Sequence, residues 1–394
     1  MATLYGGAMP DDFVSGEELT ATEFNKVKNY WIVDGDLPEG PEINDGDVVF
    51  VLGDEVGAPE AEITAITGSG ITHTYGDFVA FEFLTSGSMT CTEGLLNEAL
   101  LVGGGGASGG SSNQSVGSAT NSQGGGGGGG GFLSVPSMFV PSSTLNVVVG
   151  TGGLAAPANG YALGFNGIAS GIQNVAYSPG GGGGASRLSN DGNTGASGGG
   201  SGGNAGTGGT GTPGVGNDGG AGTSGGAGGG AGSAGTGTVG DLADPSLPGD
   251  GLASTITGSS VIYAGGGAAG GGTTGGSGGG GDSGGPNTPG NPGTDGLGGG
   301  AGGAGYSTTG SKLGAAGGSG VVIVKVLATN AANVDKSGWT EVTTAMLAAA
   351  EKKRKAERKK LEAKIVLEQK KLALEEKNEE LSGATQMDIE GDLI

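Results

Sequence analysis

Few side chains in this sequence have the types and spacing that catalysis or metal binding requires. The chain has one histidine, His73, and one cysteine, Cys91. Because neither has a second histidine or cysteine beside it, neither predicts a metal site or an activated nucleophile. We expect His73 to be a surface or strand residue. We expect Cys91 to be a small buried thiol in a reduced compartment.

Acidic residues and glycine motifs are the other candidates for ligand chemistry. The acidic residues are Asp34, Asp36, Glu39, Glu42, Asp45, Asp47, Asp54 and Glu55. Their oxygens suit Ca²⁺, but the EF-hand spacing is absent, and the alternative is a solvated acidic surface. Gly-x-Gly-x-x-Gly recurs by chance at this glycine content and opens no convincing helix that would hold a phosphate. We therefore predict no enzyme, no cofactor and no metal.

Aromatic side chains within or beside the glycine-rich segments are the candidates for contact with a partner. They are Tyr161, Phe165, Tyr177, Tyr263 and Tyr306. Rings give contact area at a low entropic cost, which suits a sugar or a protein surface. The alternative is that they fill a small core between strands.

Composition divides the chain into unequal parts. Of 394 residues 99 are glycine, and 83 of these fall within 101–320. Collagen is excluded because glycine does not recur at every third residue and proline is scarce. One cysteine excludes a disulfide scaffold, and no apolar run is long enough to span a membrane. The first ten residues also lack the features of a secretion signal.

Charge is distributed as unevenly as glycine. The formal net charge is −22, and residues 1–100 carry 19 acidic and 2 basic residues. Of the 17 basic residues, 11 lie within 352–377 among 5 acidic ones. Because most of the chain is acidic, we do not expect it to bind nucleic acid or an anionic membrane. The glutamates interleaved with the basic residues of 352–377 argue against nucleic-acid binding by that segment as well.

The first 80 residues predict a small α+β domain for assembly or attachment. Residues 19–31 read as a helix, because Thr20 and Glu23 form a capping box and Phe24 shares a face with later apolar residues. Strands are predicted at 47–53, 61–67 and 77–84.

Residues 81–327 predict a mainly β and irregular domain in which glycine tracts alternate with apolar islands. The clearest strands are 98–102, 145–149 and 321–326. A flexible linker has no reason to contain such islands, so we favour an ordered tract. Glycine lets extended helices with three residues per turn lie side by side, with backbone hydrogen bonds between them. We therefore expect polyglycine II segments between short strands.

The remaining residues predict a linker, a helix and a tail. The linker is 328–339, the C-terminal α-helix is 340–382 and the acidic tail is 383–394. The helix has one apolar stripe of Leu361, Ile365 and Leu372 and another of Leu367, Leu374 and Leu381. Two stripes suggest contacts on both sides, for oligomerisation or docking, rather than a simple dimeric coiled coil.

Four motifs in a fixed order resemble the glycine-rich domain of bacteriophage tail-fibre and other virion appendage proteins. They are LLVGGGG at 100–106, VVVGTGG at 147–153, YSPGGGGGAS at 177–186 and GSGVVIV at 318–324. The helical C-terminal end is not a usual part of that domain. The resemblance therefore leaves open which end attaches to the particle.

The resemblance implies a structural virion protein, a tail-fibre or tail-tip subunit that binds the host surface. Its expected partners are other virion proteins, further copies of itself, as a homotrimer or another homo-oligomer, and a protein or glycan receptor. No membrane insertion is expected, and assembly would take place in the host cytoplasm. The alternatives are a non-viral coat or matrix protein and, less favoured, an enzyme that degrades the host envelope.

Overall fold

The computed structural model describes residues 59–343, with gaps, together with Met346 and three strands before residue 59. The gaps are 112–122, 156–162, 187–190, 204–205, 223–224, 238–245, 270 and 272. The three strands, β1 (Thr3–Tyr5), β2 (Tyr30–Asp34) and β3 (Val48–Leu52), form one sheet in the order β1-β3-β2. β3 confirms the strand predicted at 47–53. The helix predicted over 19–31 is wrong at its end, because Tyr30 and Trp31 pair with β3 in β2.

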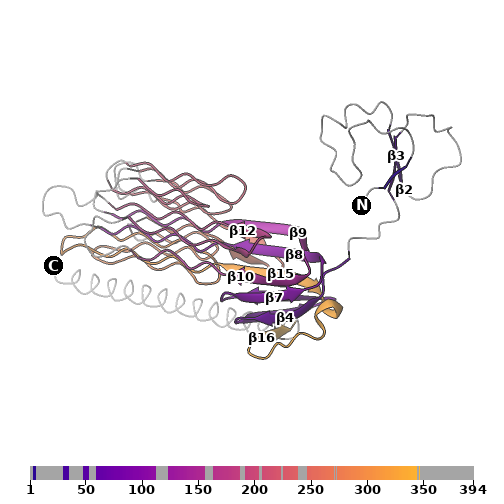
Figure 1. Ribbon diagram of the computed structural model, residues 1–394. Helices are drawn as coiled ribbons and strands as arrows, with labels where there is room; N and C mark the ends of the chain where they lie inside the picture. Colours follow the sequence, from indigo (N-terminus) through magenta and orange to yellow (C-terminus); the bar gives the residue numbers. More distant parts are fainter. Residues whose placement is uncertain are drawn as a thin grey trace, which may run out of the picture.

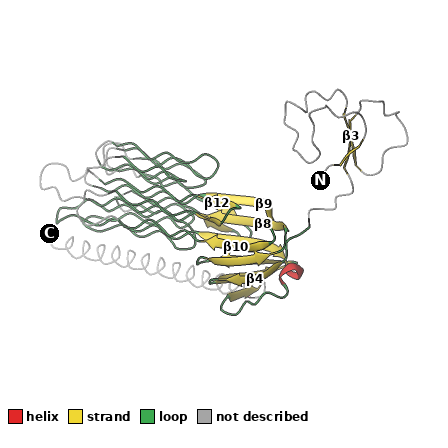
Figure 2. Ribbon diagram, in the orientation of Figure 1, coloured by secondary structure: helices red, strands yellow, loops and turns green. Residues whose placement is uncertain are grey.

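Two sheets form a β-sandwich at one end of the glycine-rich domain (Figures 1 and 2). One sheet has the order β12-β11-β10-β7-β4 and the other the order β16-β5-β6-β15-β8-β9. The first contains β4 (Ile63–Thr67), β7 (Gly87–Cys91), β10 (Ser143–Val148), β11 (Ser170–Ile172) and β12 (Ala176–Ser178). The second contains β5 (Gly70–Tyr75), β6 (Phe78–Phe83), β8 (Gly94–Val102), β9 (Phe132–Val140), β15 (Val321–Leu327) and β16 (Thr340–Thr343). The strands predicted at 61–67, 77–84, 98–102, 145–149 and 321–326 are thereby confirmed.

Alternating residues of β6 show how the sequence positions the core. Val79, Phe81 and Phe83 lie between the two sheets and are buried. Ala80 lies on the opposite face of the six-stranded sheet, where it packs under the hairpin of β13 (Leu252–Ser254) and β14 (Val261–Tyr263). This sheet is covered on both faces, which explains why β15 is a nearly continuous apolar run rather than an alternating one.

The covered outer face of the six-stranded sheet also holds one ion pair and one hydrogen bond between a histidine and a carboxylate. Lys325 Nζ lies 2.5 Å from Glu98 Oε2, between paired strands β15 and β8. His73 Nε2 lies 2.7 Å from Glu82 Oε2, between paired strands β5 and β6. His73 is thus a strand residue, one of the two positions expected for it.

Beyond the sandwich, the glycine tract forms a bundle of extended segments with a three-residue hydrogen-bond period (Figure 1). Within 103–111, every third amide donates to residues 125–131, at N···O distances of 2.8–3.0 Å. The amides one residue further along in each three-residue period donate to residues 165–168. The amides two residues further along donate to residues 312–318. Three residues per turn and no hydrogen bonds within a segment define the polyglycine II helix. The expected polyglycine II segments are confirmed by this pattern.

Each central segment has six neighbours. Residues 124–131 donate to 179–185, 226–229 and 298–304, and their carbonyl groups accept from three further segments. All eight residues of this segment are glycines and all are buried. A Cβ on Gly127 would lie well inside van der Waals contact of the Gly106 carbonyl oxygen. At Gly127 the segments therefore approach so closely that only glycine fits.

Three predicted boundaries differ from the structure. The predicted domain boundary between residues 80 and 81 falls inside β6, because β5 and β6 belong to the same sheet as β15. The linker predicted at 328–339 is packed: η2 (Ala328–Ala331) follows β15, and Trp339 meets the Phe81 and Phe83 rings edge-on, with centroids 6.0 and 4.9 Å away. Helix 340–382 cannot begin at Thr340, because 340–343 form β16 and pair with the otherwise unprotected edge of β5.

Candidate functional site

The five aromatic candidates fall into three environments. Phe165 and Tyr177 are exposed, with 56% and 72% of their surface accessible. Tyr263 is buried and Tyr306 is half-buried. Tyr161 lies outside the described residues. Among the four candidates that the structure describes, only Phe165 and Tyr177 have most of their surface accessible.

Tyr263 is a core residue, the second of the two positions expected for the aromatic candidates, and is not available for contact with a partner. Its ring packs near Phe132, with centroids 6.5 Å apart, between the β13–β14 hairpin and the six-stranded sheet. Burial raises the pKa of its phenol, and the Glu82 carboxylate raises it further. Tyr75 anchors the same hairpin by donating its hydroxyl to the Ile256 carbonyl group. Burial, together with Glu98, raises the pKa of Tyr75 to about 12.

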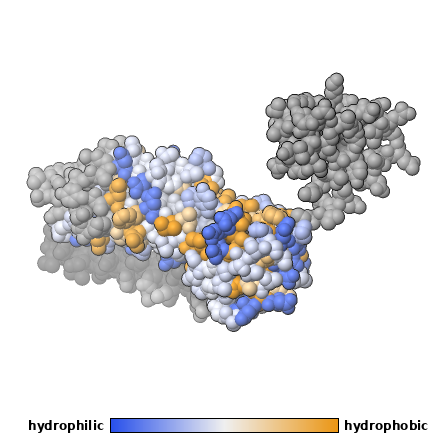
Figure 3. Space-filling model, viewed as in Figure 1, coloured by the Kyte–Doolittle hydropathy of each residue, from blue (hydrophilic) through white to orange (hydrophobic). Residues whose placement is uncertain are grey.

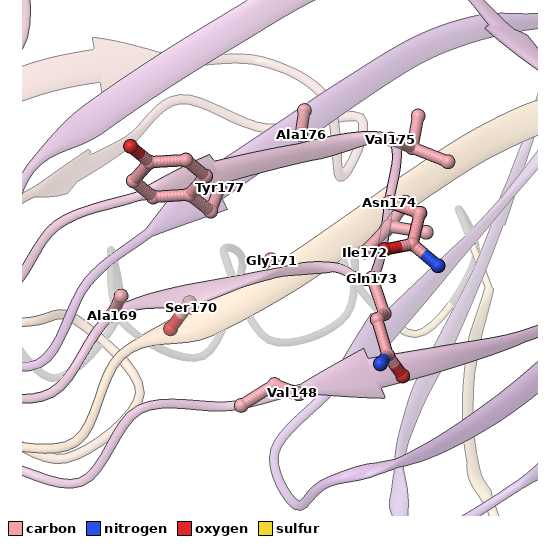
Figure 4. A pocket seen from close by; sticks show the side chains of 10 residues that line it. All are labelled: Val148, Ala169, Ser170, Gly171, Ile172, Gln173, Asn174, Val175, Ala176 and Tyr177. Carbon is pink, nitrogen blue, oxygen red and sulfur yellow. The ribbon is translucent and has the colours of Figure 1, made fainter.

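Tyr177 borders a depression on the β11–β12 hairpin (Figure 4). The volume of this depression is about 610 Å³, and its lining is mostly apolar. The lining residues are Val148, Ala169, Ser170, Gly171, Ile172, Gln173, Asn174, Val175, Ala176 and Tyr177. Figure 4 shows the Tyr177 ring at one end and the carboxamides of Gln173 and Asn174 at the other, with Gly171 between them. A Cβ on Gly171 would meet the Ala176 carbonyl oxygen and Tyr177 in the paired strand, so glycine lets β11 and β12 approach closely here.

The depression continues into exposed apolar side chains along the bundle, which we call the apolar ridge. The ridge consists of Val148, Leu154, Phe165, Ile168 and Tyr177, all exposed. Phe165 and Ile168 are three residues apart and therefore share one face of a polyglycine II helix. The Ile168 amide donates to the Thr151 carbonyl at 2.9 Å, so the neighbouring segments run side by side. Figure 3 shows apolar surface on the bundle and where the bundle meets the sheets.

Residue type predicts only part of this ridge. Phe165 and Tyr177 are expected as contact residues because they are aromatic, whereas Leu154 and Ile168 are not. Val148, Thr151 and Leu154 recur at a spacing of three, as do Phe165, Ile168 and Gly171. A search at the polyglycine II period rather than at the strand or helix period would have found them.

Aspartates outside this surface bind backbone and hydroxyl groups of the turns. Asp191 Oδ1 accepts from the Thr207 amide at 2.7 Å and from its hydroxyl at 2.9 Å, and these bonds hold the pKa of Asp191 below its usual range. Asp250 Oδ1 accepts from the Ser277 hydroxyl and amide, which lower its pKa similarly. In the described part of the chain no three His, Cys, Asp or Glu side chains are placed to share a metal ion.

Other expectations fall partly or wholly outside the described residues. The side chains of the acidic run 34–55 lie there, as do the six oligomerisation candidates between Leu361 and Leu381. Cys91 is described and is buried as expected, and burial raises the pKa of its thiol. No helix in the described ranges is long and apolar enough to cross a bilayer.

Comparison with known proteins gives one family. The sequence model of the glycine-rich domain matches residues 84–327. This range runs from the end of β6 to the end of β15 and includes the whole bundle. No curated protein matches the chain.

Proposed function

We propose that this chain, which belongs to the glycine-rich domain family, is a structural subunit of a tailed bacteriophage, of the tail-fibre or tail-tip type. In this proposal it contacts the host surface by binding and performs no catalysis. It is assembled in the host cytoplasm and joins other virion proteins.

The observation that carries this proposal is the exposed apolar ridge on a stiff scaffold. Backbone hydrogen bonds tie 103–111 and 124–131 to six neighbours each. Such a lattice holds attached side chains at fixed spacings and lowers the entropic cost of binding. Repeated copies on one particle would add weak contacts through multivalency. The order of the four glycine motifs, which resembles that of virion appendage proteins, supports the same function.

Immunogold electron microscopy tests the location of the protein. Antibodies against residues 59–343 would be applied to particles and cells from the strain that carries the gene. The proposal expects gold on the tail appendages of released particles. Gold confined to the cell envelope or the surrounding matrix would contradict it and would favour the non-viral coat protein.

Analytical ultracentrifugation tests self-assembly. Full-length protein would be compared with a truncation that ends at Thr343, which keeps Trp339 and β16 in place. We expect a discrete homo-oligomer, such as a trimer, for the full chain and a monomer for the truncation. A truncation that assembles like the full chain would contradict the role assigned to the two apolar stripes of 340–382.

A further inference from the structure

The depression beside Tyr177 is uncharged, although the chain is strongly acidic. None of its ten lining residues carries a formal charge at neutral pH, whereas the whole chain has a net charge of −22. The net negative charge of the chain disfavours anionic ligands at long range, and an uncharged lining offers a cation no counter-ion. The electrostatics therefore favour a neutral ligand.

The lining has two kinds of group at opposite ends. Tyr177 presents a flat ring, and 72% of the surface of this residue is accessible. Gln173 and Asn174 present carboxamides, which both donate and accept hydrogen bonds. Gln173 is held in place by a 2.7 Å hydrogen bond from Asn146 Nδ2 to its Oε1. A ligand that matches this set has an apolar face for the ring and hydroxyl groups for the amides.

The size of the surface argues against a second copy of the chain as the occupant. From Val148 to Leu154 the ridge spans two helical turns, or about 19 Å, across two or three segments. The ridge has five exposed apolar residues, whereas a stable protein interface takes about 20–30 residues from each partner. The 610 Å³ depression lies within the usual range of small-ligand sites.

We propose that the depression on the β11–β12 hairpin is a subsite for a neutral pyranose sugar, with Tyr177 stacking on the C–H face of the ring and Gln173 and Asn174 binding its hydroxyl groups. The proposal rests on the proposed function, since it names the class of surface receptor as a neutral glycan. The ridge residues Ile168 and Phe165 then lie beside the next units of the same glycan.

Saturation-transfer NMR on the full-length protein tests this subsite. The probes are the methyl glycosides of glucose, galactose, mannose and the two common N-acetylhexosamines, with glucuronic acid as a charged comparison. We expect transfer to at least one neutral pyranoside and weaker transfer to glucuronic acid. Tyr177→Ala should weaken binding by about tenfold, and Tyr177→Phe should retain it because the stacking face is kept.

Phe139→Ala is the matched control, because Phe139 is also exposed but lies on β9, outside the depression. It should leave sugar binding unchanged. The proposal is overturned if no neutral pyranoside gives transfer above the level of Tyr177→Ala. A concentration-dependent dimer that Tyr177→Ala abolishes would also overturn it, in favour of a contact between copies. Immunogold labelling of particles is independent of either result, so failure of the subsite leaves the appendage proposal standing.

Discussion

The sandwich buries Phe81 and Phe83 between two sheets, whereas the centre of the bundle buries residues 124–131, which have no side chains at all. In the sandwich, apolar area removed from water supplies the stabilisation, and the sheets are held apart by side chains. In the bundle, closely spaced backbones exchange hydrogen bonds with six neighbours. One chain thus forms two ordered regions whose sequence requirements are opposite: large apolar residues in one and none in the other.

The largest expected effect is a single methyl group placed in the bundle. In Gly127→Ala the new Cβ would collide with the Gly106 carbonyl oxygen, and neither backbone can move without breaking its other hydrogen bonds. We expect the bundle not to assemble, seen as loss of its cooperative unfolding transition by circular dichroism. Gly285→Ala is the control, since its Cβ would meet nothing closer than 3.8 Å, and its transition should stay within about 0.5 kcal/mol of wild type.

The corresponding change in the sandwich removes a side chain. Phe81→Ala leaves a cavity between the sheets and should lower the free energy of unfolding by about 3–5 kcal/mol, measured by chemical denaturation. Because the sheets keep their backbone pairing, we expect a folded but less stable protein. A Phe81→Ala protein as stable as wild type would contradict the importance of side-chain packing here.

Alkaline pH should affect the sandwich and its hairpin first. The pKa values of Tyr75, Tyr263 and Cys91 are raised in the folded protein, so their neutral forms stabilise it. This contribution is complete below the unfolded values and is lost as pH rises, above about 10 for the tyrosines. The melting temperature of the wild-type protein should fall between pH 8 and pH 12. The melting temperature of Tyr75→Phe should fall less steeply over the same range. Parallel curves for the two proteins would exclude a role for the Tyr75 phenol.

Acid should destabilise the turns of the bundle, and this is the smallest of the expected effects on stability. The pKa values of Asp191 and Asp250 are lowered in the folded protein, so their charged forms stabilise it. This contribution is present above the unfolded value, about 3.9, and is lost as pH falls further. Asp250→Asn should melt slightly lower than wild type at pH 7, and the difference should narrow at pH 3. A constant difference would show that ionisation of Asp250 does not matter.

The strands could be predicted from the sequence because they follow familiar periods. β6 alternates and β15 is continuously apolar, and both were located within a residue or two. The polyglycine helices could be expected from the alternation of tract and island. Their neighbours could not, because residues 103–111 pair with segments up to about 200 residues away and glycine carries no side-chain signal for the partner. For the same reason, the sequence does not indicate that Leu154 and Ile168 lie on the same surface as the other residues of the candidate site.

The segment after β15 shows a different failure. Residues 328–339 have the composition of a linker, and Thr340 precedes a strongly helical sequence. In the structure Trp339 reaches the sandwich core and Thr340–Thr343 add to β5. Tertiary contacts with Phe81 and Phe83 determine the structure of this segment, and these contacts cannot be predicted from local propensity.

Hydrogen exchange tests the claim that the bundle is an ordered hydrogen-bonded lattice. Native-state exchange measured by mass spectrometry would compare peptides from 123–131 with peptides from β15. We predict that the amides of 124–131 exchange as slowly as those of β15, because each donates to a neighbouring backbone in the buried centre. Complete exchange of 124–131 within seconds, while β15 stays protected, would show that the glycine tract is a flexible chain and would contradict this account.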